Sequence, residues 1–286
     1  MEGELYKKVY RIVIETASNK TIKRATFTNA QIVLTYFWAV IHDRPVCWAC
    51  QKKNWPIYYR RQALPTPSTM TRRLRRSDIQ QLLKDLEQKL LNNFTRSTCR
   101  WVDGKPLVVG GASKDGESRF GFGASCICRG YKLHAVADQK QGFVQWKITP
   151  MNRGESKVAE ELIPELDTGG YLVGDTAYDS NKLYEIAAQQ KIQMVACRKP
   201  GKNLGHRSHS PHRIRSRELL EQPFGQSLIA GRKIIERMFG NLVSFPCGLK
   251  PLPHWVRTLY RVEMWVRSKI ILYQLWRTGK MMKNLA

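Results

Sequence analysis

The sequence is poor in acidic residues. Its 286 residues hold 23 Asp and Glu against 48 Lys and Arg, which gives a formal net charge of +25. The deficit lies at the two ends, because residues 1–100 carry a net charge of +12, residues 198–286 carry +14, and residues 101–197 are close to neutral at −1. Positive blocks of this kind favour a polyanionic partner, most often nucleic acid. A ribosomal or membrane-surface protein is the alternative.

Long apolar runs are also missing. The sequence has no run of ~18 uncharged apolar residues, so we expect no membrane span. Residues 1–15 alternate charged and apolar side chains and lack the apolar centre of a signal peptide. The seven cysteines are an odd number without the spacing of a disulfide framework, which fits the reducing cytoplasm. Hydrophobic residues make up 42% of the chain, enough for a packed core.

The first hundred residues have helical periodicity. We predict helices at 30–42, 46–54, 68–76 and 78–91 in a helical domain over residues 1–98, with Thr28 or Asn29 as the first cap. The short arginine-rich helix at 68–76 resembles the recognition helix of a helix-turn-helix. Its arginines and two nearby ones would contact phosphates or guanine edges: Arg60, Arg61, Arg72, Arg73, Arg75 and Arg76. The alternative is a small helical bundle whose arginines are solvated.

From residue 99 the periodicity changes to that of strands. Strands are predicted at 99–110, 131–137, 143–149, 171–174 and 193–197, and helices at 155–166, 180–190, 232–245 and 255–276. Residues 198–230 are expected to form a basic loop. The order of these elements predicts an α/β domain over residues 99–286, with a mixed sheet that begins as an antiparallel meander.

Three acids are placed where this architecture can bring them together. Asp103 interrupts the first strand, Asp175 ends the fourth, and Glu236 lies in a helix of the strongly basic C-terminal segment. Carboxylates arranged in this way can hold two Mg²⁺ ions, since Mg²⁺ prefers hard oxygen ligands and keeps water for a substrate phosphate. Two such ions can support phosphoryl transfer.

Five segments resemble a known family, and they occur in that family's order. The chain is similar to the bacterial insertion-sequence DDE transposases of the fourth and fifth insertion-sequence families. The matching segments span roughly residues 100–276: Val102-Asp-Gly-Lys-Pro-Leu, Arg129-Gly-Tyr-Lys-Leu-His, Ile148-Thr-Pro-Met-Asn, Leu172-Val-Gly-Asp-Thr-Ala-Tyr-Asp-Ser and Ile234-Ile-Glu-Arg-Met-Phe-Gly-Asn-Leu.

The resemblance implies a ribonuclease-H-like catalytic domain that holds two Mg²⁺ or Mn²⁺ ions with Asp103, Asp175 and Glu236. Arg232 stands four residues before Glu236, as in the Tyr, Arg, Glu, Lys signature of the fourth family. The Tyr and Lys positions of that signature are Ile229 and Val243 here. This departure favours the fifth family and leaves a hairpin-forming mechanism unsupported.

The implied activity is DNA transposition: strand cleavage at transposon ends and strand transfer into target DNA. The partners would be the terminal inverted repeats and target duplex, held by a homodimer in the cytoplasm, at the bacterial nucleoid. We expect DNA contacts from the N-terminal arginines above and from a second set: Arg198, Lys199, Arg207, Arg213, Arg215, Arg217 and Arg232. A catalytically inactive or domesticated DNA-binding protein, or a non-transposing nuclease of the same fold, are the alternatives.

Each predicted acid has a competing structural interpretation. Asp115 is the rival of Asp103, but its Lys114-Asp-Gly setting is typical of a turn, whereas an acid within a strand is costly without a function. Asp175 is a candidate helix cap, although Asp179 and the residues after it supply a cap for the following helix. Glu236 is a candidate solvated helix acid.

Zinc binding is a further alternative for the Cys47/Cys50 and Cys126/Cys128 pairs and for the histidines of 206–212. We interpret the cysteines as ordinary thiols and the histidines as part of a basic loop that follows phosphates.

Overall fold

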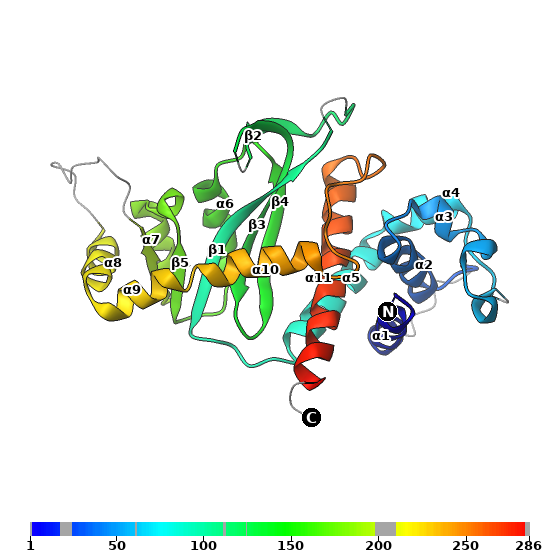
Figure 1. Cartoon of the computed structure of the whole chain (residues 1–286), viewed down its shortest axis with the longest axis horizontal. Helices are drawn as coiled ribbons and strands as arrows, with labels where there is room; N and C mark the ends of the chain where they lie inside the picture. The colour runs from blue at the N-terminus through cyan, green and yellow to red at the C-terminus, as the bar shows by residue number, and fades with distance from the viewer. Residues whose placement is uncertain are drawn as a thin grey trace. The chain divides into compact units, whose positions relative to one another are not determined.

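The computed structural model describes residues 2–17, 25–60, 62–110, 113–123, 125–197 and 210–283. The chain divides into two compact units (Figure 1). Residues 1–93, 242–255 and 264–286 form the first unit, and residues 94–241 and 256–263 form the second. The last two long helices, α10 (Lys233–Ser244) and α11 (Leu259–Lys283), therefore each contribute residues to both units.

The first unit is helical throughout its described part. Helix α2 is its core, because it is buried on nearly all sides and its Trp38 ring contacts Tyr6 and Trp55 at centroid distances of 5.0 and 4.8 Å. Thr28 caps α2 in a capping box with Gln31, as the sequence predicts. The elements are α1 (Glu2–Thr16), α2 (Asn29–Ile41), α3 (Val46–Ala49), η1 (Lys52–Asn54), η2 (Ile57–Tyr59), α4 (Pro67–Leu74) and α5 (Ser77–Leu91).

A buried lysine joins the C-terminal helix to these N-terminal helices. The Lys269 ammonium is fully buried; it donates to the Val40 and Cys247 carbonyls at 2.9 Å and pairs with the Asp43 carboxylate at 2.5 Å. Three donors thus meet three acceptors, which compensates for the burial of the charge. None of the helices in the described ranges combines the length and apolarity needed to cross a membrane.

The second unit is built on a mixed sheet. Strand β3 pairs antiparallel with β1, β2 and β4, and β1 pairs parallel with β5, which pairs parallel with β6. The main strand order is therefore β4-β3-β1-β5-β6, with the short β2 pairing the beginning of β3. The strands are β1 (Cys99–Val108), β2 (Arg119–Phe122), β3 (Ile127–Asp138), β4 (Gly142–Pro150), β5 (Tyr171–Gly174) and β6 (Gln193–Ala196). This confirms the predicted α/β sheet with an early antiparallel meander.

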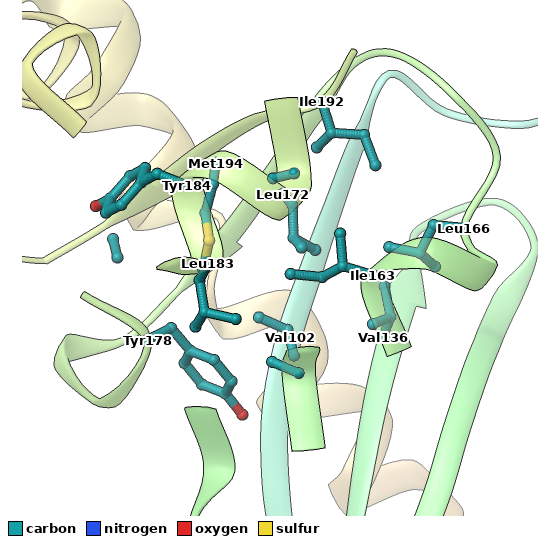
Figure 2. Close-up of a cluster of buried hydrophobic side chains, with 13 residues drawn as sticks. Val102, Val136, Ile163, Leu166, Leu172, Tyr178, Leu183, Tyr184, Ile192 and Met194 are labelled. Carbon is teal, nitrogen blue, oxygen red and sulfur yellow. The ribbon is translucent and has the colours of Figure 1, made fainter. Parts of the chain in front are cut away.

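An apolar core covers one face of this sheet. Alternate residues of the strands, Val102, Val136, Leu172 and Met194 among them, pack against side chains of the helices that follow β4 and β5 (Figure 2). Because strand side chains alternate between faces, Asp103 points to the opposite side from Val102. The covering elements are α6 (Glu155–Leu162), η3 (Ile163–Glu165), η4 (Thr176–Tyr178) and α7 (Asn181–Gln189).

Helix α10 crosses the other face (Figure 1). The Trp101 indole donates to the Leu228 carbonyl at 3.4 Å, and Phe239 stacks on Phe143 of β4 at a centroid distance of 5.5 Å. The first contact joins β1 to α9 (Pro223–Ala230), and the second packs Phe239 of α10 against β4.

The segment at 198–230, predicted as a loop, contains two helices in its described part. They are α8 (Pro211–Glu221) and α9 (Pro223–Ala230), and each has a proline in its first turn. Proline is tolerated there because the first-turn N–H groups have no helical partner anyway. The loop prediction was therefore wrong for residues 211–230.

Candidate active site at the junction of two parallel strands

Asp103 and Asp175 stand where β1 and β5 part. The two strands pair only at Cys99–Tyr171, Arg100–Leu172 and Trp101–Val173. Asp103 and Asp175 each come two residues after the last pair, Trp101–Val173. Because parallel strands advance by the same distance per residue, the two aspartates are side by side. The chain leaves β1 toward β3 and leaves β5 toward β6. Such a reversal of strand order opens a crevice at the carboxyl ends of the strands, where α/β sheets bind their ligands.

The Asp103 carboxylate is half-buried and short of donors. Burial raises the pKa of Asp103 to about 6, and the charges of Asp175 and Glu155 add to the rise, while a 2.8 Å hydrogen bond from the Gly104 N–H and the charge of Arg232 oppose it. A buried acid beside two others is costly to ionise, and a cation would relieve this cost. The location fits a cation-binding acid.

Asp175 also has a local structural role. Its Oδ1 accepts from the Ala177 N–H at 2.8 Å and caps the short helix η4. Asp175 is therefore a helix cap, as the competing interpretation proposed, and it is also next to Asp103.

Asp179 is not the cap of α7, contrary to the sequence prediction. Ser180 occupies the cap position without a side-chain hydrogen bond. Asp179 instead forms a bidentate pair with Arg213 of α8, at 2.8 and 2.7 Å. The pair joins the turn before α7 to α8, and the sequence did not indicate it because the partners are 34 positions apart.

Glu155 is a third acid near Asp103 that the sequence analysis missed. It begins α6, and its Oε1 pairs with the Lys132 ammonium of β3 at 2.8 Å. A Cβ added at Gly104 would lie 2.9 Å from the same oxygen, so the carboxylate lies against β1 at Gly104, on the opposite face of the strand from the Asp103 side chain. The signal that was available is the glycine after Asp103, which leaves room for a neighbouring group.

The predicted third acid, Glu236, lies on α10 one turn after Arg232. Its side chain is exposed, whereas Arg232 is half-buried and close enough to lower the pKa of Asp103. The Arg232 Nε is buried without a hydrogen-bond partner among the described residues. In that part of the chain no three His, Cys, Asp or Glu side chains are close enough together to hold a metal ion. Asp175, Glu155 and Arg232 all lie near enough to Asp103 to shift its pKa.

The acid pair suits a hard divalent cation. Mg²⁺ is bound through one or two carboxylates, with water and substrate phosphate completing its coordination, so Asp103 and Asp175 supply the minimum protein ligand set. A cavity of about 470 Å³ lies at the start of α6 and is lined by, among others, Ala177, Glu155, Lys132, Arg153 and Phe122, but not by Asp103 or Asp175. Its two basic side chains are paired with carboxylates, Lys132 with Glu155 and Arg153 with Glu161.

The predicted DNA-contacting residues fall into three groups. Arg73 and Arg213 are engaged within the fold: Arg73 donates to the Phe27 carbonyl and to Asn29 at 2.8 and 2.6 Å, and Arg213 pairs with Asp179. Arg72, Arg75, Arg76 and Arg215 are exposed, Arg217 is half-buried, and Arg60 donates to the Trp55 carbonyl at 2.8 Å. Arg61, Arg198, Lys199 and Arg207 lie outside the described residues, as do His206 and His209.

A family model described as Transposase DDE domain matches residues 95–273, more than half of the chain. The chain belongs to the transposase DDE domain family. The match contains the whole described sheet of this DDE domain and both junction aspartates.

A solved structure is also similar to this DDE family member: the piggyBac transposase synaptic complex with hairpin DNA, determined by cryo-electron microscopy. The identity is 10%, the coverage is 98% of this chain and 74% of that one, and the TM-score is 0.46. No curated protein matches the sequence.

Proposed function

We propose that the protein is a DNA transposase that cleaves strands at the ends of a transposon and transfers them into target DNA. The observation that carries the proposal is the pair Asp103 and Asp175 at the open end of the β1–β5 pairing, within a chain of the transposase DDE domain family. The strand order β4-β3-β1-β5-β6, antiparallel on one side of β1 and parallel on the other, supports a ribonuclease-H-like assignment of the domain.

Asp103, Asp175 and Glu236 are the proposed ligands of two Mg²⁺ or Mn²⁺ ions. When bound, these cations would activate the attacking oxygen and stabilise the leaving oxygen of the phosphodiester. Support for Glu236 comes from its place on α10, one turn after the arginine that acts on the Asp103 pKa.

The chain's own residues then position the DNA. Arg232, with an unpaired buried Nε, is placed to donate to a phosphate near the acids, since a guanidinium binds phosphate oxygens in a forked geometry. Exposed arginines such as Arg72, Arg75 and Arg215 would hold the DNA backbone. Cleavage by water releases a 3′-hydroxyl, whose oxygen then forms the new bond to a target phosphorus while the target's own 3′-oxygen leaves. Joining two ends favours a homodimer on DNA, in the cytoplasm at the nucleoid.

The test uses duplexes that carry the inverted repeats bracketing the reading frame, with Mg²⁺ or Mn²⁺. Wild-type protein is expected to nick these ends and join them to plasmid DNA. Asp103→Asn, Asp175→Asn and Glu236→Gln are expected to bind the ends without cutting, while Glu185→Gln, an exposed acid on α7, keeps full activity. Cleavage by the Asp175 variant would contradict the proposal.

The same assay separates the alternatives. An inactive DNA-binding protein would bind ends and never cut, and a non-transposing nuclease would cut unrelated duplex equally well without joining.

A further inference from the structure

The three most exposed large apolar side chains that the structure describes in the second unit lie on β2 and the start of β3, at the upper end of the sheet in Figure 1. Phe120 and Phe122 are 66% and 72% exposed, and Ile127 is 67% exposed. Phe122 is the cross-strand partner of Ile127, and Phe120 is two residues before Phe122, so the three side chains share one face. We call this surface the β2–β3 face. Large apolar side chains gathered on a surface mark an interaction site.

The backbone that carries this face is held in place. A Cβ added at Gly121 would lie 2.5 Å from the Met151 carbonyl oxygen, so β2 lies directly against the end of β4. Arg129, the cross-strand partner of Phe120, donates to two backbone carbonyls of the loop before β2 at 2.7 and 2.5 Å. The β2–β3 face is therefore preorganised, which lowers the entropy cost of binding.

The β2–β3 face and the Asp103 carboxylate lie on the same face of the sheet. Phe120 pairs with Arg129, and Asp103 pairs with Ala135, six residues later on β3. Residues an even number of positions apart on a strand share a face, and the register shift of β3 against β4 comes later, after Val136. Six residues of strand correspond to about 20 Å, or about six base pairs of duplex.

The stretch from 113 to 119 presents positive charge beside the β2–β3 face. Lys114 and Arg119 are exposed. The two acids of this stretch are engaged within the fold, because Asp115 is buried and Glu117 accepts from the Leu259 N–H at 2.6 Å. Apolar side chains flanked by exposed cations suit DNA, whose base steps accept apolar side chains and whose phosphates are negative.

A second copy of the chain fits this surface less well. Lys114 and Arg119 would approach their own copies across a two-fold interface, and like charges brought together in this way cost free energy. Strand β2 has only four residues, so its outer edge offers few backbone groups for pairing with a strand of another chain.

We propose that the β2–β3 face binds the bases of the transposon-end DNA about six base pairs from the phosphate that is cut, with Phe120 inserted into a base step. Inserted phenylalanines unstack the step and bend the duplex. The β2–β3 face would then fix the position of the duplex relative to the acids. This inference rests on the proposed function, because it requires DNA held at Asp103 and Asp175.

The test places the fluorescent base 2-aminopurine, which brightens when its stacking is lost, at successive positions of the end duplexes. The parent protein is Asp175→Asn, which is expected to bind the ends without cutting. It should raise the fluorescence several-fold at one step, about six base pairs from the cut position. Phe120 is the residue to change, because Phe122 also borders the cavity at the start of α6.

Phe120→Ala, made in this parent, should abolish the rise and weaken binding of the ends about 10-fold. The salt dependence of binding, which reports the number of phosphate contacts, should stay the same. Phe120→Trp keeps a stacking ring and should keep the rise. The Phe120 side chain is exposed, so these substitutions should leave the fold intact.

Val108→Thr is the matched control. Val108 is an exposed apolar residue at the same end of the sheet, but it pairs with Gly130 and therefore lies on the opposite face from Phe120. Its fluorescence rise and affinity should equal those of the parent. A loss as large as that of Phe120→Ala would contradict the assignment of the face.

The remaining outcomes separate the inference from the proposed function. End binding without a rise at any position, or a rise that Phe120→Ala keeps, would overturn the inference alone. A parent that binds the ends no better than unrelated duplex would overturn the proposed function as well. Sedimentation without DNA tests the other occupant: a dimer that dissociates in Phe120→Ala would mean that a second copy covers the β2–β3 face, and the inference would be wrong.

Discussion

Two Asp-Gly pairs of this chain have opposite surroundings. Asp103-Gly104 lies in β1 at the junction with β5, and Asp115-Gly116 lies in the loop between β1 and β2. The Asp115 carboxylate is 3% exposed and accepts from the Tyr131 hydroxyl at 2.7 Å and from the Thr258 and Glu117 N–H groups at 3.0 and 3.1 Å. Asp103 accepts from its neighbour Gly104.

The pKa values follow the number of donors. Burial acts to raise the pKa of both acids, but at Asp115 the hydrogen bonds from Tyr131 and from backbone N–H groups outweigh burial and lower it. At Asp103 burial prevails and the pKa rises to about 6. A carboxylate surrounded by donors holds the fold together, whereas one buried with few donors is available to a ligand.

Asp103→Asn should abolish strand cleavage, with a loss of at least about 10³-fold, or about 4 kcal/mol of activation free energy. The reason is the loss of a charge that the cations require. Asp115→Asn should lower activity only in proportion to the protein that unfolds. Initial rates of end cleavage, normalised to folded protein, distinguish the two. Equal normalised losses would remove the contrast.

Asp115→Ala should lower the free energy of unfolding by about 3 kcal/mol at pH 7, because it leaves buried donors unpaired. Since the folded-state pKa of Asp115 is lowered, its contribution is present above pH ~4 and is lost as the pH falls through the folded pKa. Urea unfolding of Asp115→Ala, Tyr131→Phe and the double variant measures the coupling. Additive losses would show that the Tyr131–Asp115 hydrogen bond contributes nothing.

Asp103→Asn should raise the free energy of unfolding by about 1–3 kcal/mol at pH 7.5 in cation-free buffer. The folded-state pKa of about 6 lies above the usual 3.8, so wild-type stability falls as the pH rises from about 4 through 6. The gain should vanish below about pH 3, where Asp103 is protonated in both the folded and the unfolded state. Thermal unfolding from about pH 3 to 8 measures it, and a gain independent of pH would contradict the burial of an ionised acid.

Gly104→Ala and Gly116→Ala compare the glycines themselves. An added Cβ at Gly104 would meet Glu155 Oε1 at 2.9 Å and Lys132 Cδ at 3.1 Å, whereas Gly116 has nothing within 4 Å. Both variants should fold with stability changes within about 1 kcal/mol. Cation affinity should drop a few-fold for Gly104→Ala and stay unchanged for Gly116→Ala. Equal affinities would mean that the position of the Glu155 carboxylate is unimportant.

The sequence predicted the sheet and the position of its acids because strand ends are local signals. Asp175 follows a four-residue apolar strand whose bounds the structure matches, and Asp103 interrupts a strand. Strand β2 was not predicted because it has only four residues and lies in a glycine-rich stretch. Two of its four residues are exposed phenylalanines. Helices α8 and α9 were not predicted because the segment at 198–230 is strongly basic and was interpreted as a loop, although each helix begins with a proline, which suits a first helical turn.

The parts that could not be predicted depend on contacts between residues far apart in the chain. Asp115 has the local signature of a turn, yet Thr258, 143 positions away, supplies one of its donors. Glu155 resembles any acid in the first turn of a helix until Lys132 and Gly104 are placed beside it. Arg73 and Arg213 carry the charge expected of DNA contacts, and only the fold shows that they are held by Asn29 and Asp179. That Glu236 is the third acid of the site stays a prediction.

The short pairing of β1 with β5 also has a mechanical consequence. β1 is joined to β3 at nine residue positions but to β5 at only three. Under a force that pulls neighbouring strands apart, β1 should separate from β5 before it separates from β3, because fewer backbone hydrogen bonds connect β1 to β5. The acids lie at the end of this three-residue pairing. A cation held by Asp103 and Asp175 would therefore link β1 to β5 and strengthen the weakest strand pairing of the sheet.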